Sequence, residues 1–382
     1  MPEFACPKIH SKNVTLNPLK VKGKMLIGFI VFLGLISLLV NNCGSRRYPL
    51  ETKLSVPTHH IEVGMIFLEK GKLDDAKREF QLALEMVPTA VKAYVGLALI
   101  SAQKGNEKEA WEHLKKAEAL AKNDEDKLGM LVGKIRLADL LYSPELLSLA
   151  KGAFNEVMVL RPGYAPACFY MAQVYEHAFM FKDAKSLLNS VLNSENPLAL
   201  QAYNKLDRLE KIQIAQPISL LAKEIGLKDR VTKAEMAALL THELKLPQIL
   251  EIGQVSNMVL KDIGNQRFGE EIELIVPLGI KELSATVDGY FDPEIVVTKA
   301  SFCQIAESIL FKLTGAQIGF KNLRSPYKDL KAKQPYYNAC MICLIKGIVV
   351  PKNRAKFGPL VPVSGADVLL GLRRLREEAR LF

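Results

Sequence analysis

Between residues 57 and 197 the sequence repeats itself every 34 residues, and this period limits the possible folds more than any other feature. The repeated positions hold small and large apolar residues: Gly64, Phe67, Gly71, Ala76, Phe80 and Ala83 in the first copy, and Ala98, Ser101, Gly105, Ala110, Leu114 and Ala117 in the second. After a slip of six residues, the third and fourth copies continue with Ala138, Leu141, Ala150 and Phe154, and with Ala172, Tyr175, Ala184 and Leu188. A small residue where two helices cross lets their backbones approach, and a large residue fills the adjoining groove.

This pattern resembles the tetratricopeptide repeat (TPR), whose unit is a pair of antiparallel helices. The resemblance implies an all-α fold, with four TPR units over residues 57–197 that stack into a solenoid. The groove-facing positions that it implies are Met65, Leu68, Val95, Leu99, Asp139, Tyr142, Phe169 and Gln173. Such a mostly apolar groove favours a helix or extended segment of another protein as its partner. The alternative is that individual side chains in this set pack between repeats.

Residues 198–216 are expected to form a polar-faced helix that closes this array and connects it to the next unit. Beyond it, a second and longer repeat places Val231–Met236, Val297–Phe302 and Val363–Val368 at equal intervals of 66 residues. The second residue of each segment, Thr232, Thr298 or Ser364, precedes an amphipathic stretch and is therefore predicted to cap a helix. Thr232 and Glu235 form the sequence signature of a capping box.

These segments, together with Gly279-Ile280, Gly289-Tyr-Phe-Asp-Pro293 and Lys261-Asp-Ile263, resemble the S-layer homology (SLH) domain. The resemblance implies three mainly helical copies over residues 217–382 that pack as one unit and bind cell-wall polymers, often acidic ones, near each helix start. The candidate glycan- or anion-binding residues that it implies are Thr232, Lys233, Thr298, Lys299 and Ser364. Gly365 stands where the third copy would carry a basic residue, which argues against strong binding of an acidic glycan. The alternative is that the three hydroxyl residues serve only as helix caps.

The N-terminal residues have the pattern of an export signal. Lys20, Lys22 and Lys24 precede an apolar run over residues 25–40, and Cys43 follows it. The run is short for a membrane-spanning helix. This arrangement resembles a bacterial lipoprotein signal, which implies a leader over residues 1–42, lipidation of Cys43 and a linker over residues 43–56. An uncleaved helical anchor is the alternative, and translation starting nearer Met25 also stays open.

Neither composition nor motifs point to catalysis or to nucleic acid. The formal net charge is +10, but five lysines lie within the leader, and the remaining charge is interpreted as spread along the chain. Phosphate-binding loops, HExxH and GxSxG are absent from the sequence. Cys340 and Cys343 have redox or metal-ligand spacing, but they lie in an apolar stretch that predicts a buried helix, without further ligands nearby. We therefore expect no enzyme activity, no cofactor and no metal site.

Together these patterns predict a cell-envelope adaptor that is anchored to a membrane, as an outer-membrane lipoprotein that faces the periplasm or the cell surface. Its TPR groove would bind an envelope protein, and its SLH-like unit would bind cell-wall glycan or peptidoglycan. The alternative is a structural subunit of a secretion, pilus or surface-fibre assembly, in which the SLH-like unit docks protein rather than glycan.

Overall fold

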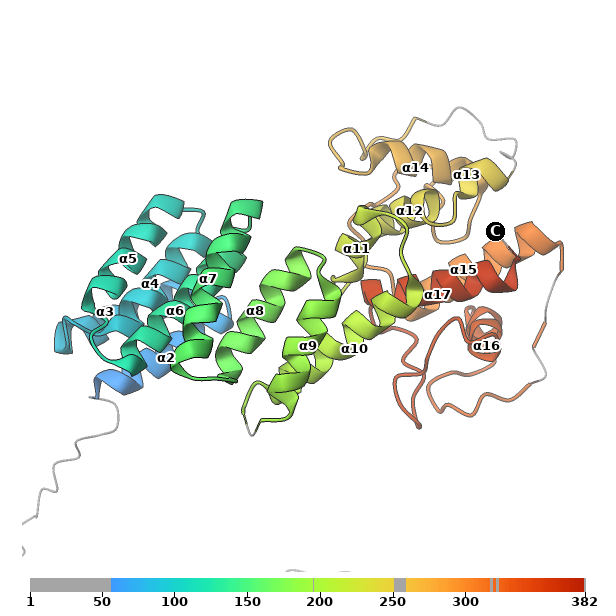
Figure 1. The fold of residues 1–382 in the computed structure, drawn as a ribbon. Coiled ribbons are helices and arrows are strands. Elements are labelled where there is room, and N and C mark those ends of the chain that lie inside the picture. Colours follow the sequence, from blue (N-terminus) through green and yellow to red (C-terminus); the bar gives the residue numbers. More distant parts are fainter. Residues whose placement is uncertain (1–55, 195, 251–258, 317–318, 321–322, 381–382) are drawn as a thin grey trace, which may run out of the picture. The chain divides into compact units, whose positions relative to one another are not determined.

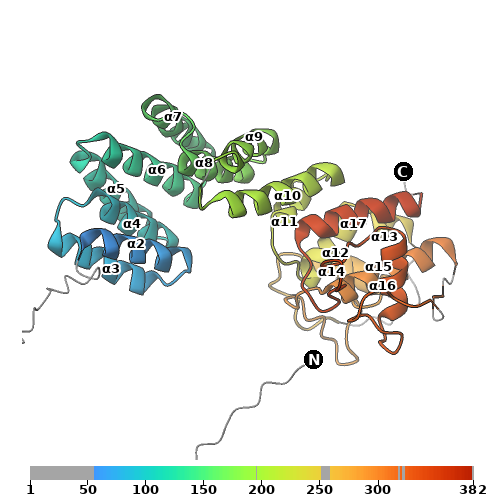
Figure 2. The same ribbon diagram turned by 90° about the horizontal axis from the view of Figure 1, so that it is seen from below.

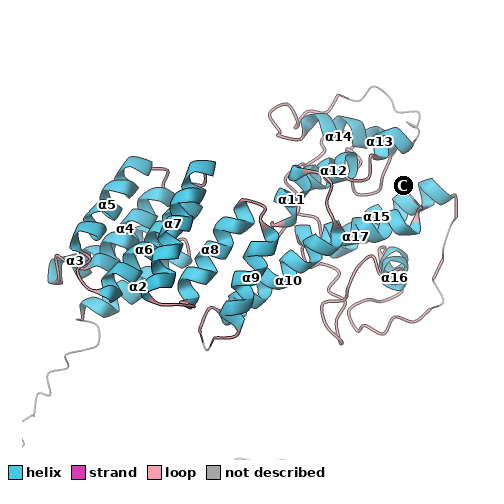
Figure 3. Cartoon of the chain, viewed as in Figure 1, coloured by secondary structure: helices cyan, strands magenta, loops and turns pink. Residues whose placement is uncertain are grey.

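The computed structural model describes residues 56–194, 196–250, 259–316, 319–320 and 323–380. Within these ranges the regular elements are helices, supplemented by two isolated β-bridges (Figure 3). The prediction of an all-α, helical-repeat fold is therefore confirmed. The predicted leader, the apolar run over residues 25–40 and Cys43 lie outside the described residues.

Eight consecutive helices form four hairpins, at the positions that the 34-residue period predicts (Figure 1). The hairpins are α2 (Pro57–Glu69) with α3 (Leu73–Met86), α4 (Val91–Gln103) with α5 (Glu107–Leu120), α6 (Asp124–Leu140) with α7 (Pro144–Leu160), and α8 (Ala165–His177) with α9 (Phe181–Leu192). Gly71 and Gly105 adopt φ angles of +70° and +79° in the first two hairpin turns, a left-handed conformation that glycine adopts without strain. The helix α4 packs against α6, and α6 packs against α8, so these first helices lie side by side (Figure 2).

The packing of Phe80 explains why small residues recur at the helix crossings. Its side chain on α3 is fully buried between Gly64 of α2 and Gly96 of α4. A Cβ atom added to Gly64 would lie 2.7 Å from the Phe80 ring, and one added to Gly96 would lie 2.3 Å from it. The ring therefore occupies the space that two absent side chains leave, as the repeat pattern predicts.

The helix α10 (Ala199–Ala215) has almost the bounds predicted for the closing and connecting helix, and it lies between the two repeat arrays. It packs against α9 on one side and against α17 (Gly365–Glu378) on the other. Its buried residues Leu209 and Ile212 belong to a core cluster that extends from α8 to α17. Apolar burial is therefore continuous across the expected boundary between the arrays.

The remaining helices form the three-copy unit, a name we use for residues 217–380. Besides α17 they are α11 (Leu220–Gly226), α12 (Lys233–His242), α13 (Leu246–Ile249), α14 (Gly269–Ile275) with the short η2 (Val276–Leu278), α15 (Lys299–Thr314) and α16 (Tyr337–Ile345). Thr232, Thr298 and Ser364 cap α12, α15 and α17: each side chain accepts a hydrogen bond from a backbone N–H three residues later. The three predicted caps are confirmed, as is the capping box at Thr232 and Glu235.

A closed ring of backbone hydrogen bonds joins the three copies. The N–H of Val231 donates to the carbonyl of Val363 at 3.2 Å, Val363 donates to Val297 at 3.0 Å, and Val297 donates to Val231 at 2.8 Å. These valines are 66 residues apart in the sequence and buried in the structure. Because each copy uses its neighbours' backbones, the three copies form one unit and not three separate modules.

Candidate functional site

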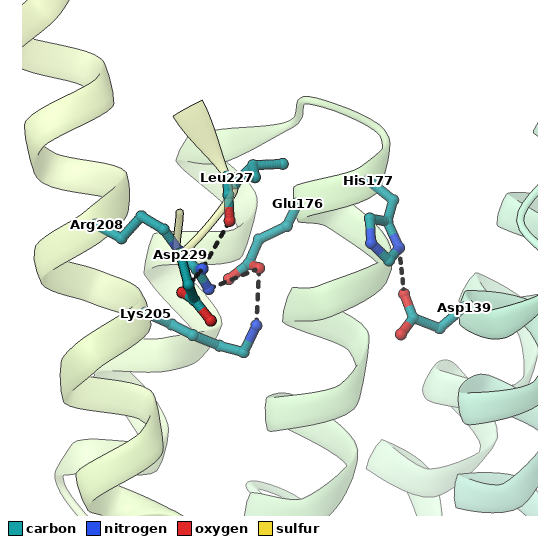
Figure 4. Close-up of polar contacts among 7 residues, drawn as sticks. All are labelled: Asp139, Glu176, His177, Lys205, Arg208, Leu227 and Asp229. Carbon is teal, nitrogen blue, oxygen red and sulfur yellow. Dashed lines mark hydrogen bonds and ion pairs between the residues drawn. The ribbon is translucent and has the colours of Figure 1, made fainter. Parts of the chain in front are cut away.

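The helices α6 and α8, with the turn that follows α6, gather polar and aromatic side chains on one face. Nδ1 of His177 lies 2.8 Å from Oδ1 of Asp139 (Figure 4), and the His177 ring lies 5.9 Å from the ring of Tyr142. On the same two helices, the guanidinium of Arg136 lies 4.4 Å from the centroid of the Tyr170 ring. We call this set the polar–aromatic face; its residues are Arg136, Asp139, Tyr142, Tyr170, Gln173 and His177.

Neighbouring side chains on this face shift one another's pKa values, and some of its aromatic rings are open to solvent. The hydrogen bond with Asp139 raises the pKa of His177 above its ordinary value, although burial opposes the shift. Burial raises the pKa of the Tyr170 hydroxyl, while the nearby Arg136 opposes that rise. The side chains of Tyr142 and His177 stay exposed. Arg136 contacts the half-buried Tyr170, whereas Tyr142 is exposed. Tyrosine and arginine are among the residue types that dominate protein–protein binding energy.

Half of the groove residues that the sequence predicts lie in the core instead. Leu68, Val95, Leu99 and Phe169 keep only 1–6% of their surface exposed, which agrees with the alternative that these side chains pack between repeats. For Val95, Leu99 and Phe169, the neighbouring first helices pack closely together, α4 against α6 and α6 against α8. A Cβ atom on Gly133 of α6, for example, would lie 2.5 Å from the Val95 side chain.

The other four predicted groove residues are more accessible. Met65 is half-buried against the core of the hairpin array. Asp139, Tyr142 and Gln173 belong to the polar–aromatic face. Arg136, Tyr170 and His177 were not predicted from the sequence. The available signal was the spacing of polar and aromatic residues by three and four positions along otherwise apolar helices.

A charge cluster around the buried Glu176, beside the polar–aromatic face, holds α8 to α10 (Figure 4). Glu176 is 5% exposed, and Oε2 of its carboxylate accepts a hydrogen bond from Nζ of Lys205 at 2.9 Å. Arg208 lies 3.9 Å from the same oxygen and donates to the carbonyl of Leu227 at 2.7 Å and to Asp229 at 3.0 Å. Removing one partner from a buried ion pair is costly. This cluster therefore joins the last hairpin to the beginning of the three-copy unit.

The predicted lysines at the helix starts point into loops of the next copy. The ammonium of Lys233 donates to the carbonyl of Phe291 and lies 4.3 Å from the centroid of its ring. Lys299 repeats the arrangement: it donates to the carbonyls of Val350 at 2.7 Å and Phe357 at 3.1 Å. Burial lowers the pKa of both lysines. An anion-binding role for them stays a prediction, and any anion would compete with these carbonyls.

Two aspartates hold the same loops and were not identified as site residues from the sequence. Asp262 accepts hydrogen bonds from the backbone N–H groups of Phe291 and Asp292, at 2.7–3.1 Å. Asp329 accepts them from Phe357 and the glycine after it, at 2.8 Å each. Burial raises the pKa of each carboxyl, but these hydrogen bonds outweigh it and the net shift is downward. The recurrence of Lys-Asp at residues 261–262 and 328–329 was the available signal.

In the third copy, geometry explains why glycine replaces lysine. A Cβ atom on Gly365 would lie 1.7 Å from the carbonyl oxygen of Ile225, so no side chain fits there. The Gly365 N–H donates to the carbonyl of Lys228 at 2.9 Å, which brings the two backbones together. Ser364 caps α17, and its hydroxyl also lies 2.7 Å from a carboxylate oxygen of Asp367. The third helix start is therefore filled by backbone of the first copy.

The cysteines of the three-copy unit lie in its core. Cys340 and Cys343 are fully buried on α16, as predicted, and the Cys343 thiol lies 3.7 Å from the carbonyl of Cys303 on α15. The cysteines within the described ranges are free thiols. Those ranges also contain no cluster of three or more His, Cys, Asp and Glu side chains arranged to hold a metal ion.

Comparison with known proteins leaves the chain without an assigned family. No protein-family model matches it, and no curated protein is significantly similar to it. Within the part of the chain that the structure describes, no helix is both long and apolar enough to cross a bilayer.

Proposed function

We propose that this protein is a membrane-anchored scaffold of the cell envelope, in which a TPR-like array binds a protein partner. The observation that carries this proposal is the polar–aromatic face on α6 and α8. It offers arginine, tyrosine and histidine side chains on rigid helices, and such residues commonly anchor a bound protein segment. Neighbouring hairpins continue the same layer of first helices, which gives an extended partner a surface to follow.

The second part of the proposal concerns the three-copy unit, which would bind cell-wall or surface polymer in an SLH-like way. Its support is the threefold recurrence of capped helix starts around the valine ring. The positive end of a helix dipole favours anionic groups at such starts. Thr232 with Lys233 and Thr298 with Lys299 are the residues that would contact the polymer.

The same lysines favour a second candidate function. In it, the protein is a structural subunit of a larger assembly, and its three-copy unit docks protein. The ammonium groups of these lysines already donate to carbonyls of the next copy. Moreover, a cavity of about 450 Å³ near the first helix start is lined by Asp262, Asp292 and Glu294. These carboxylates would repel an acidic polymer.

The membrane attachment belongs to the proposal on sequence grounds alone. The basic residues, the apolar run over residues 25–40 and Cys43 support a lipoprotein anchor in the outer membrane, with an uncleaved helix as the alternative. In either form the chain would be tethered, and its role would be to hold partners together and not to catalyse a reaction.

Site-specific photocrosslinking in cells tests the protein-binding part. A photoreactive residue at Tyr142 or Gln173 should capture one and the same protein, because both positions lie on the polar–aromatic face. The matched controls are Glu112 and Lys115, two exposed residues of α5. Adding Arg136→Glu should reduce the adduct about tenfold, since arginine is a common binding hot spot. Equal adducts from face and control positions, or none from the face, would remove this assignment.

A further inference from the structure

The positive charge of the chain is concentrated in one segment that runs from the end of α15 into the third copy. Residues 308–366 contain ten lysines and arginines against Asp329 as the single acidic residue, a net charge of +9 in a chain whose total is +10. Among the basic residues of this segment that the structure describes, only Lys346 forms an ion pair, with Glu378. Asp329, which interacts with Lys356, is the one carboxylate within the segment, so its positive charge is largely uncompensated by the segment itself, and an anionic ligand would relieve the repulsion.

Three of these cations surround a cavity. Arg324, Lys328 and Lys331 line a space of about 810 Å³, together with the aromatic side chains of Tyr327 and Tyr337. We call it the basic cavity. It lies between the loop that precedes α16 and the first turn of that helix, so it is separate from the capped helix starts at Thr232, Thr298 and Ser364.

Hydrogen bonds fix the walls of the basic cavity. The hydroxyl of Tyr337 on α16 donates to the carbonyl of Leu323 at the start of the loop. The backbone N–H of Lys331 donates to the Gln334 side chain at 2.7 Å, and that side chain donates back to the carbonyl of Asp329 at 3.3 Å. The cations are therefore presented by a loop tied to the core, which lowers the entropic cost of binding.

A second basic loop lies against the first. Asp329 accepts the backbone hydrogen bonds of Phe357 and the following glycine, and the Phe357 ring lies 6.0 Å from that of Tyr327. This contact brings the turn with Lys352, Arg354 and Lys356 next to the basic cavity. Asp329 accepts both of these N–H groups and also interacts electrostatically with Lys356, and the segment offers its cations no other carboxylate.

We propose that the basic cavity binds a phosphate-bearing ligand with at least two negative charges. The planar guanidinium of Arg324 suits two oxygens of one phosphate, and the two lysines add point charges for the remaining ones. The cavity is larger than one phosphate group, and Tyr327 offers an aromatic surface to whatever the phosphate is attached to. The ligand chemistry is a phosphate ester, whether it comes from a lipid headgroup or from a soluble or polymeric phosphate.

Calorimetric titration of the full chain in nonionic detergent with inorganic pyrophosphate tests this site. We expect saturable binding that weakens about tenfold or more when Arg324, Lys328 and Lys331 are all replaced by glutamine. The matched control replaces Lys70, Lys108 and Lys115, three exposed lysines of the hairpin array, with glutamine and should leave binding unchanged. Circular dichroism would establish that both triple variants are folded.

Competition then identifies the source of the phosphate. Displacement of pyrophosphate by mixed micelles that contain phosphatidylglycerol would indicate a lipid headgroup, whereas displacement only by polyphosphate would indicate a soluble or polymeric ligand. Both results support the site. The proposal is overturned if pyrophosphate does not bind saturably, if both folded triple variants bind alike, or if duplex DNA binds while pyrophosphate does not.

Discussion

Replacing Gly365 with alanine is expected to destabilise the three-copy unit by about 3 kcal/mol, because the added methyl group meets backbone that cannot move aside. It would lie 1.7 Å from the carbonyl oxygen of Ile225 and 2.8 Å from the Cα atom of Gly226. Relief of this overlap would separate the first and third copies, which the nearby ring of valine hydrogen bonds holds together. Urea unfolding of the full chain, followed by circular dichroism and by hydrogen exchange of α12 and α17, measures the effect.

The matched control for that experiment is Gly264→Ala. Among the described residues, nothing lies within 4 Å of a Cβ atom at Gly264, so we expect a change within about 0.5 kcal/mol. Equal urea midpoints for wild type, Gly365→Ala and Gly264→Ala would mean that the close contact between the first and third copies is absent in solution.

Removal of the Phe80 side chain should have a comparably large effect on the hairpin array. Phe80→Ala is expected to cost about 4 kcal/mol, because it empties the space between α2 and α4 that the ring now fills. Gly96→Ala alone should cost about 2 kcal/mol, since its methyl group would lie 2.3 Å from that ring. Urea unfolding of the two single variants measures both values.

The double variant makes this prediction sharper. Once the ring is gone, the methyl group at residue 96 no longer overlaps with it. The substitution then stabilises α4 by about 1 kcal/mol, because alanine has a higher helix propensity than glycine. Phe80→Ala/Gly96→Ala should therefore be no less stable than Phe80→Ala. A double variant whose loss equals the sum of the two single losses would show that Gly96 and Phe80 do not share one space.

The repeats explain how much of the fold was predictable. Recurring small and large residues 34 positions apart determine where helices turn and cross, and the four hairpins and α10 have nearly the expected bounds. Capping is a local effect, so Thr232, Thr298 and Ser364 could be placed from a few neighbouring residues. The valine ring could not be predicted, since it depends on how three distant segments close on one another.

The predicted groove residues were less reliable because burial is a property of packing and not of position within a repeat. Val95 and Leu99 occupy first-helix positions of the expected kind, yet α6 covers them. The sequence shows that the third copy has Gly365 in place of a basic residue. Only the approach of the Ile225 backbone explains why no side chain is present there. The concentration of basic residues over 308–366, by contrast, is visible in the sequence, and describing the charge as spread along the chain was wrong.

The proposal that one chain holds a protein and a wall polymer together is tested most directly by sedimentation with purified sacculi. The full chain would carry its photocrosslinked partner at Tyr142 and be centrifuged with and without sacculi, in detergent. We expect the adduct to pellet only with sacculi, and soluble wall fragments in excess to return it to the supernatant. A folded adduct that stays in the supernatant with sacculi would contradict the bridging role and leave the three-copy unit as a protein-docking element.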